Sequence, residues 1–255
     1  MRAPRHEIRV RTPGGWVTMV DVESVCQHLA AAGVAGIDGF RAKLISNRGW
    51  APVFQDLLFE ASTALMFARA HCSVSMRESP DLEVTMGAHR FFAEVKHFRR
   101  KRQDDIDDQQ LSEASSLLVP YGDTVPSEGS AAWDQVAAVA CKKVLQYRPG
   151  VPNVLVINSS SANCIDEVII PTAIDKIDEI CRTTPNHGLR KLNGIMLVSE
   201  EVNISRGGRN VHFFEGSRSA VLLPDEVRAM LNGMALWFGD DRFSKGTGSA
   251  CPSVA

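Results

Sequence analysis

The residues best suited to chemistry lie in one short stretch, 79–98, which reads SPDLEVTMGAHRFFAEVKHF. Glu94 and Lys96 are two positions apart, so a β-strand would place both side chains on one face. Asp81 begins the preceding apolar segment, and a tight antiparallel hairpin would bring it beside Glu94. Carboxylate oxygens are ligands for Mg²⁺, and a neighbouring lysine can orient a water and offset charge on phosphoryl oxygens. The stretch therefore predicts a metal site with an adjacent lysine.

A fourth acidic residue stands out on the helix that we expect over residues 52–69. At about 100° per residue, Glu60 falls inside the arc occupied by the apolar side chains of this segment. An ionised carboxylate that faces a core without a partner costs roughly several kcal/mol. Glu60 is therefore expected to have a partner, a metal ion or a raised pKa.

The pattern of elements along the chain predicts an α/β fold with a central mixed β-sheet flanked by helices. Period-2 alternation and valine- or isoleucine-rich runs predict strands, and apolar residues at helical spacing predict helices. The strands are expected at 72–77, 81–86, 90–98, 151–161, 192–202 and 211–216, and the helices at 21–33, 52–69, 131–147, 166–182 and 224–238.

Three regions are expected along the chain. Residues 1–50 form an N-terminal extension that is helical in part, and residues 51–240 form the main domain. An insertion at about 99–130 interrupts this domain, and residues 241–255 form a disordered tail rich in glycine and serine.

The stretch resembles a known motif. Pro80 and Asp81, followed after residues 82–93 by Glu94-Val95-Lys96, are similar to the PD-(D/E)xK motif of the restriction-endonuclease-like nuclease superfamily. The resemblance extends over roughly residues 52–158, with a glutamate-bearing helix, a three-stranded meander, a further helix and a further strand. It implies a restriction-endonuclease-like core.

The resemblance also implies a role for each motif residue. Asp81 and Glu94, helped by the Val95 carbonyl, would hold Mg²⁺, with Mn²⁺ as its substitute. Lys96 would position the attacking water. Glu60 would bind a second metal ion or hold a metal-bound water.

The implied activity is Mg²⁺-dependent hydrolysis of DNA phosphodiester bonds by a metal-activated water. An endonuclease is favoured, while an exonuclease, an RNA substrate and the choice among restriction, defence, recombination and repair stay open. A homodimer is expected because cutting both strands often needs two sites, and a protein partner could supply target recognition.

Two alternatives remain. One is a catalytically inactive protein of this fold that binds DNA or acts as a scaffold within a larger complex. The other is an accidental match, which a long separation between Asp81 and Glu94 would establish.

Several residues near the motif have two interpretations. Gln135 lies on a polar stripe of the returning helix with Lys142 and Gln146, and similar nucleases often place a glutamine or lysine from this helix at the site. Such a stripe is more often a solvated face. Glu94 and Lys96 could form a surface ion pair, Glu83 is a rival ligand, and His97 is expected to be packed or satisfied.

Composition restricts the possible partners and location. The chain of 255 residues has a formal net charge of −2, so any contact with a nucleic acid must be local. The basic run 99–102 could grip phosphates or be neutralised by the acidic run 104–108. Six cysteines without a CxxC pair predict reduced, mostly buried thiols. Because neither a signal peptide nor a membrane span is present in the sequence, we expect a soluble cytoplasmic protein with no membrane contact.

Overall fold

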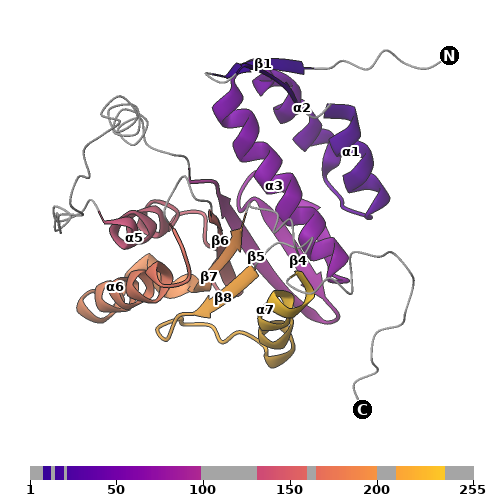
Figure 1. Cartoon of the computed structure of the whole chain (residues 1–255). Coiled ribbons are helices and arrows are strands. Elements are labelled where there is room, and N and C mark those ends of the chain that lie inside the picture. Colours follow the sequence, from indigo (N-terminus) through magenta and orange to yellow (C-terminus); the bar gives the residue numbers. More distant parts are fainter. Residues whose placement is uncertain are drawn as a thin grey trace, which may run out of the picture.

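The computed structural model describes residues 8–12, 15–19, 22–98, 131–159, 165–199 and 211–238 (Figure 1). The whole of the predicted insertion, with both charged runs, and the predicted tail lie outside these residues. Within the N-terminal extension, strands β1 (Ile8–Thr12) and β2 (Gly15–Met19) form an antiparallel hairpin. This hairpin was not predicted, although the alternation in IRVRT and the Pro-Gly that follows are signals for it.

A six-stranded sheet forms the centre of the molecule, in the order β3-β4-β5-β6-β7-β8. The first three strands are an antiparallel meander, β6 and β7 continue in parallel, and β8 returns antiparallel to β7. Their bounds are Ser73–Met76, Leu82–Met86, His89–Lys96, Asn153–Ser159, Leu192–Ser199 and Val211–Glu215. The predicted α/β class with a mixed sheet is therefore confirmed.

Helices cover both faces of this sheet (Figure 1). One side carries α1 (Val22–Ala31), α2 (Ile37–Asn47), α3 (Ala51–Arg69) and α7 (Asp225–Phe238), and the other carries α5 (Ala132–Lys142) and α6 (Ile169–Thr183). The helix predicted at 52–69 is confirmed as α3. The helix predicted at 131–147 ends earlier, at Lys142, and α2 was not predicted as a separate helix.

Two hydrophobic cores explain the alternation along the strands. Phe91, Ala93 and Val95 of β5 belong to the core beneath α1–α3, so Glu94 and Lys96 lie on the opposite face of the strand. Strand β6 is buried on both faces, and its side chains divide between the two cores. This is the pattern expected of a central strand with parallel neighbours.

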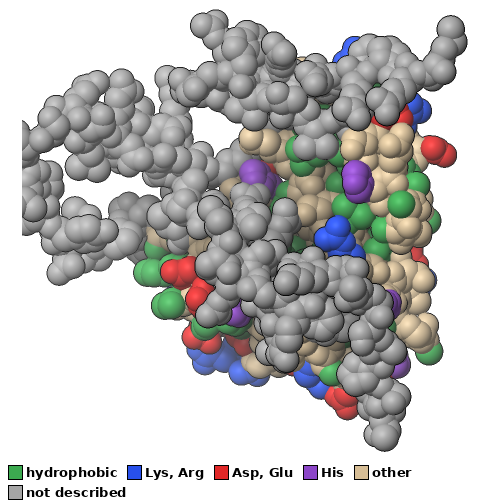
Figure 2. Space-filling model, turned by 45° about the vertical axis from the view of Figure 1, so that its right-hand side comes forward, with side chains coloured by type: hydrophobic (Ala, Val, Ile, Leu, Met, Phe, Trp, Pro, Cys, Tyr) green, Lys and Arg blue, Asp and Glu red, His purple; other side chains and the backbone are tan. Residues whose placement is uncertain are grey.

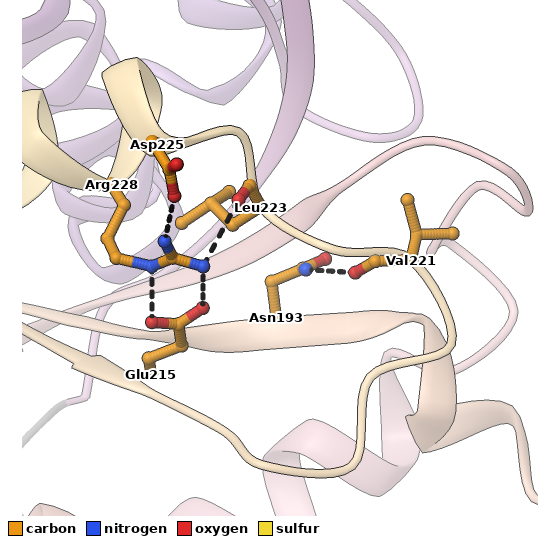
Figure 3. A network of polar contacts seen from close by, with 6 residues as sticks. All are labelled: Asn193, Glu215, Val221, Leu223, Asp225 and Arg228. Atoms are coloured by element: carbon orange, nitrogen blue, oxygen red, sulfur yellow. Dashed lines mark hydrogen bonds and ion pairs between the residues drawn. The ribbon is translucent and has the colours of Figure 1, made fainter.

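A polar network joins α7 to the last strand of the sheet (Figure 3). The Arg228 guanidinium donates two hydrogen bonds to the Glu215 carboxylate, at 2.8 and 3.1 Å, and further bonds to Asp225 and to the Leu223 carbonyl. Paired bonds between a guanidinium and a carboxylate fix orientation as well as distance. They orient α7 against β8.

Cysteine burial and membrane topology were also predicted from the sequence. Among the described residues, Cys26, Cys72 and Cys181 are buried, Cys141 is half-buried, and all four are free thiols. This agrees with the prediction of reduced, buried cysteines for these four positions. In the same part of the chain, no helix has both the length and the apolar character needed to cross a membrane.

Candidate active site

The β4–β5 hairpin brings Asp81 next to Glu94. Leu82 pairs with Ala93, so Asp81 stands beside Glu94 where the two strands separate. The ladder between the strands ends there, and the Val95 N–H donates instead to Asp81 Oδ2 at 2.8 Å. A buried backbone N–H needs such a partner. Asp81 is thereby fixed in place, and the separation that would mark the motif as accidental is not observed.

Glu94 is almost completely buried, with 1% of its surface exposed. One carboxylate oxygen, Oε1, accepts a hydrogen bond from the Lys143 ammonium. The other, Oε2, is buried without a hydrogen-bond partner among the described residues. Burial and the nearby charge of Asp81 raise the pKa of Glu94 to about 7, and Lys143 opposes this shift. Glu94 therefore does not form a surface ion pair with Lys96.

Glu60 approaches the same place from α3. Its side chain is 7% exposed, which confirms the predicted core-facing position, and Oε1 has no hydrogen-bond partner among the described residues. Burial raises the pKa of Glu60 to about 8, and Asp81 and Glu94 add to the shift, whereas Lys43 and Lys143 oppose it. Three carboxyl groups from α3, β4 and β5 are thus within electrostatic reach of one another.

Buried carboxylate oxygens without partners are unfavourable unless a proton or a cation compensates them. A divalent cation would compensate them, and the donor set fits Mg²⁺, which often binds one or two carboxylates and keeps several waters. Within the described ranges, no group of three or more His, Cys, Asp or Glu side chains is placed to hold one ion.

Two lysines act on these carboxyl groups, and a third lies on the same strand face as Glu94. Lys43 comes from α2, Lys143 follows the end of α5, and Lys96 ends β5. Lys43 and Lys143 act electrostatically on Glu60. Lys96 is half-buried, and its ammonium makes no hydrogen bond or ion pair with any residue that the structure describes.

Lys143 is one of two lysines near the site that the sequence analysis missed, and Lys43 is the other. At about 100° per residue Lys143 lies only about 20° from Val136, beside the apolar face of the helix. A lysine at such a position is the same kind of anomaly as Glu60, so the signal was present in the sequence. Gln135 is half-buried on α5, and its proposed role stays a prediction. Lys142 is exposed, as expected for a solvated face.

The remaining candidates have other partners. Glu83 pairs with Arg77 and lies 3.5 Å from Arg90, so two guanidinium groups engage the rival ligand. His97 Nδ1 lies 3.3 Å from Asp56 Oδ1, and its ring packs against Phe59 with centroids 5.8 Å apart. The prediction that His97 is packed rather than catalytic is confirmed in its first part, since the ring is largely buried against Phe59.

Comparisons of the chain with protein-family models, with curated proteins and with solved structures give no significant match. The function must therefore be argued from the geometry of the site.

Proposed function

We propose that this protein is a Mg²⁺-dependent nuclease that hydrolyses DNA phosphodiester bonds, with a restriction-endonuclease-like core. The observation that carries the proposal is the convergence of Asp81, Glu94 and Glu60. Two of these carboxyl groups are buried and each has an oxygen without a partner. Titratable groups with shifted pKa values gather at functional sites more often than elsewhere.

The order of the elements supports the same proposal. Helix α3 carries Glu60, the meander β3–β5 carries Asp81, Glu94 and Lys96, and α5 and β6 follow. This is the order that the resemblance to PD-(D/E)xK nucleases implies. Because local sequence pattern and the pairing of distant elements agree, the resemblance is stronger than the short motif alone.

Asp81 and Glu94, with the Val95 carbonyl, would hold the metal ion, and Mn²⁺ would substitute for Mg²⁺. When bound, the ion would lower the pKa of a water and neutralise charge on phosphoryl oxygens. Asp81 is oriented for this by the Val95 N–H, and Glu94 by Lys143. These contacts fix the two carboxylates before any ligand arrives.

Lys96 is suited to act on the substrate rather than on the protein. Its ammonium has no partner among the described residues, and its side chain lies on the same face as Glu94. It would orient the attacking water and stabilise the charge that develops on the phosphoryl oxygens. Glu60, whose pKa is about 8, would accept or return a proton near neutral pH.

The test combines cleavage with metal binding. Supercoiled, linear and single-stranded DNA are incubated with the protein in Mg²⁺, Mn²⁺ or EDTA, beside Asp81→Asn, Glu94→Gln and Lys96→Met variants. We expect all three variants to lose cutting by about 100-fold or more. Calorimetry should show weaker Mg²⁺ binding in the two carboxylate variants and unchanged binding in Lys96→Met. Gel filtration with and without DNA checks the proposed homodimer.

A second function has one observation in its favour. The Lys143 ammonium already pairs with Glu94, as it would in an inactive protein whose lysine had replaced a metal ion. Such a protein would serve as a DNA-binding or scaffold component of a larger complex. A wild-type chain that binds neither Mg²⁺ nor Mn²⁺ and cuts no DNA would establish this second function and refute the first.

A further inference from the structure

A cleft of about 560 Å³ opens beside the three carboxyl groups. Its walls come from the first half of α2, from the end of β3 with the turn that follows, and from the segment after α5. The lining residues are Gly36, Gly39, Phe40, Lys43, Ser75, Met76, Arg77, Glu78, Ser79 and Arg148. The site residues Asp81, Glu94 and Glu60 are not among them, so the cleft is a neighbouring feature.

Two interactions connect the cleft to the candidate active site. The Arg77 backbone N–H donates to the Asp81 carbonyl at 2.8 Å, which closes the turn that contains Ser79. Lys43 lines the cleft, and its charge also acts on Glu60, where it opposes the rise in pKa. The cleft and the carboxyl groups are therefore adjacent.

Three cations, Lys43, Arg77 and Arg148, and one carboxylate, Glu78, line the cleft, and the Arg77 guanidinium also pairs with Glu83. Lys43 lies 3.8 Å from Glu78, which is itself largely exposed. On the face seen in Figure 2, basic and acidic side chains of the described residues are scattered, without a continuous basic surface. The cleft therefore offers a local group of cations on a chain that is nearly neutral overall.

Arg148 is held in place by the fold. Its backbone N–H donates to Asn153 Oδ1 and its carbonyl accepts from Asn153 Nδ2, both at 2.8 Å. Its guanidinium donates to the Ser79 carbonyl at 2.5 Å, which joins the segment after α5 to the turn before Asp81. The remaining guanidinium donors are available to bind a phosphate.

We propose that this cleft binds the sugar-phosphate backbone of one nucleic-acid strand and leads it to Asp81 and Glu94, so that the protein takes single-stranded rather than duplex DNA. The proposal rests on the proposed nuclease function and names its substrate class. The volume lies within the range of pockets that enclose small ligands, about 300–1,000 Å³. A cleft of this volume holds a short stretch of one backbone, far less than the full width of a duplex.

Gly39 allows a specific test of the cleft. It lies in α2, is exposed, and a Cβ atom added there would meet no heavy atom within 4 Å. Gly39→Glu therefore places a carboxylate in the cleft without a steric conflict. Gly233 in α7 is a matched control, because it is also helical and its added Cβ also meets nothing within 4 Å.

Binding is measured with the whole chain in EDTA, by fluorescence anisotropy of a labelled strand of about 12 nucleotides and of the same strand in a duplex. We expect the single strand to bind about tenfold more tightly than the duplex. Gly39→Glu should weaken that binding by about tenfold or more through like-charge repulsion, while Gly233→Glu should not. Arg148→Gln should lower the slope of log K against log salt by about 0.7.

Equal binding of single strand and duplex would overturn the proposal, as would full binding by Gly39→Glu. A deoxynucleoside monophosphate that binds as tightly as the strand would also overturn it, in favour of a small-ligand site. The measurement needs neither metal nor cleavage. If strand binding depends on Gly39 but no metal supports cutting, the nuclease function fails while the strand-binding cleft stands.

Discussion

Burial of Glu60 should make the metal-free protein less stable as the pH rises, and replacing it by glutamine should remove much of that effect. Glutamine keeps the size and shape of the side chain but cannot ionise. The pKa of Glu60 is raised from 4.5 to about 8, first by burial and then by the charge of Asp81. Between about pH 4.5 and pH 8, Glu60 therefore keeps its proton in the folded state and loses it in the unfolded state.

The magnitude follows from proton linkage. Because the folded state binds the extra proton, the free energy of unfolding falls as pH rises, by roughly 1 kcal/mol per pH unit. Between about pH 5.5 and pH 7.5, Glu60→Gln should therefore gain roughly 2 kcal/mol relative to wild type. Part of the pH dependence of stability should remain in Glu60→Gln, because the pKa of Glu94 is also raised, to about 7.

Urea unfolding in EDTA, followed by circular dichroism at several pH values, measures the effect. Glu167→Gln is the control, because Glu167 is exposed and the substitution removes the same formal charge. Addition of Mg²⁺ should stabilise wild type more at the high end of the pH range, since a ligand of the ionised carboxylates stabilises the folded state by mass action. Parallel curves for wild type and Glu60→Gln in EDTA would refute the reasoning.

Three further outcomes are expected. Lys143→Gln removes the cation that lowers the pKa of Glu94, so the pH at which Mg²⁺ binding is half-complete in calorimetry should rise; an unchanged midpoint would contradict the pairing. Gly36→Ala should cost about 1–3 kcal/mol in denaturant unfolding, because Gly36, the N-cap residue of α2, has a φ of +75° and an added Cβ would lie 2.3 Å from a backbone oxygen of β3, whereas Gly39→Ala inside α2 should not destabilise. Phe91→Ala should cost about 3–5 kcal/mol in the same assay, because the ring is fully buried; a loss below 1 kcal/mol, on the order of a surface substitution, would contradict this packing.

The sequence predicted the central part of the fold because its strands alternate clearly and its turns carry the expected residues. The β4–β5 hairpin turns at Gly87, which has a φ of +57°, and its register follows from the side-chain alternation on both sides. Helix α2 was missed because only Phe40 and Leu44 are buried in it, too few to make a periodic pattern. Lys43 was missed with it.

The candidate site was predictable where one strand or one hairpin fixes the geometry. Glu94 and Asp81 meet through local pairing, and Glu60 is evident as a carboxylate at an apolar position. The contact between Lys143 and Glu94 could not be predicted from local pairing. Lys143 follows α5, and the approach of α5 to β5 depends on packing between elements distant in the sequence. Helix α5 also stops at Lys142, five residues before the predicted end at Tyr147.

The hydrogen bond from the Val95 N–H to Asp81 has a consequence for how such a site would decay in evolution. Asp81 completes the backbone bonding of β5, so selection for stability alone would retain an acceptor at this position after activity was lost. Glu60 and Glu94 have the opposite effect on stability, because each is a buried acid whose ionisation destabilises the folded state. In a lineage that no longer needed the metal-dependent activity, neutral residues at Glu60 and Glu94 would be selected first because they stabilise the fold. Glu60 and Glu94 are therefore the positions at which loss of the proposed activity would show first, whereas Asp81 would be retained.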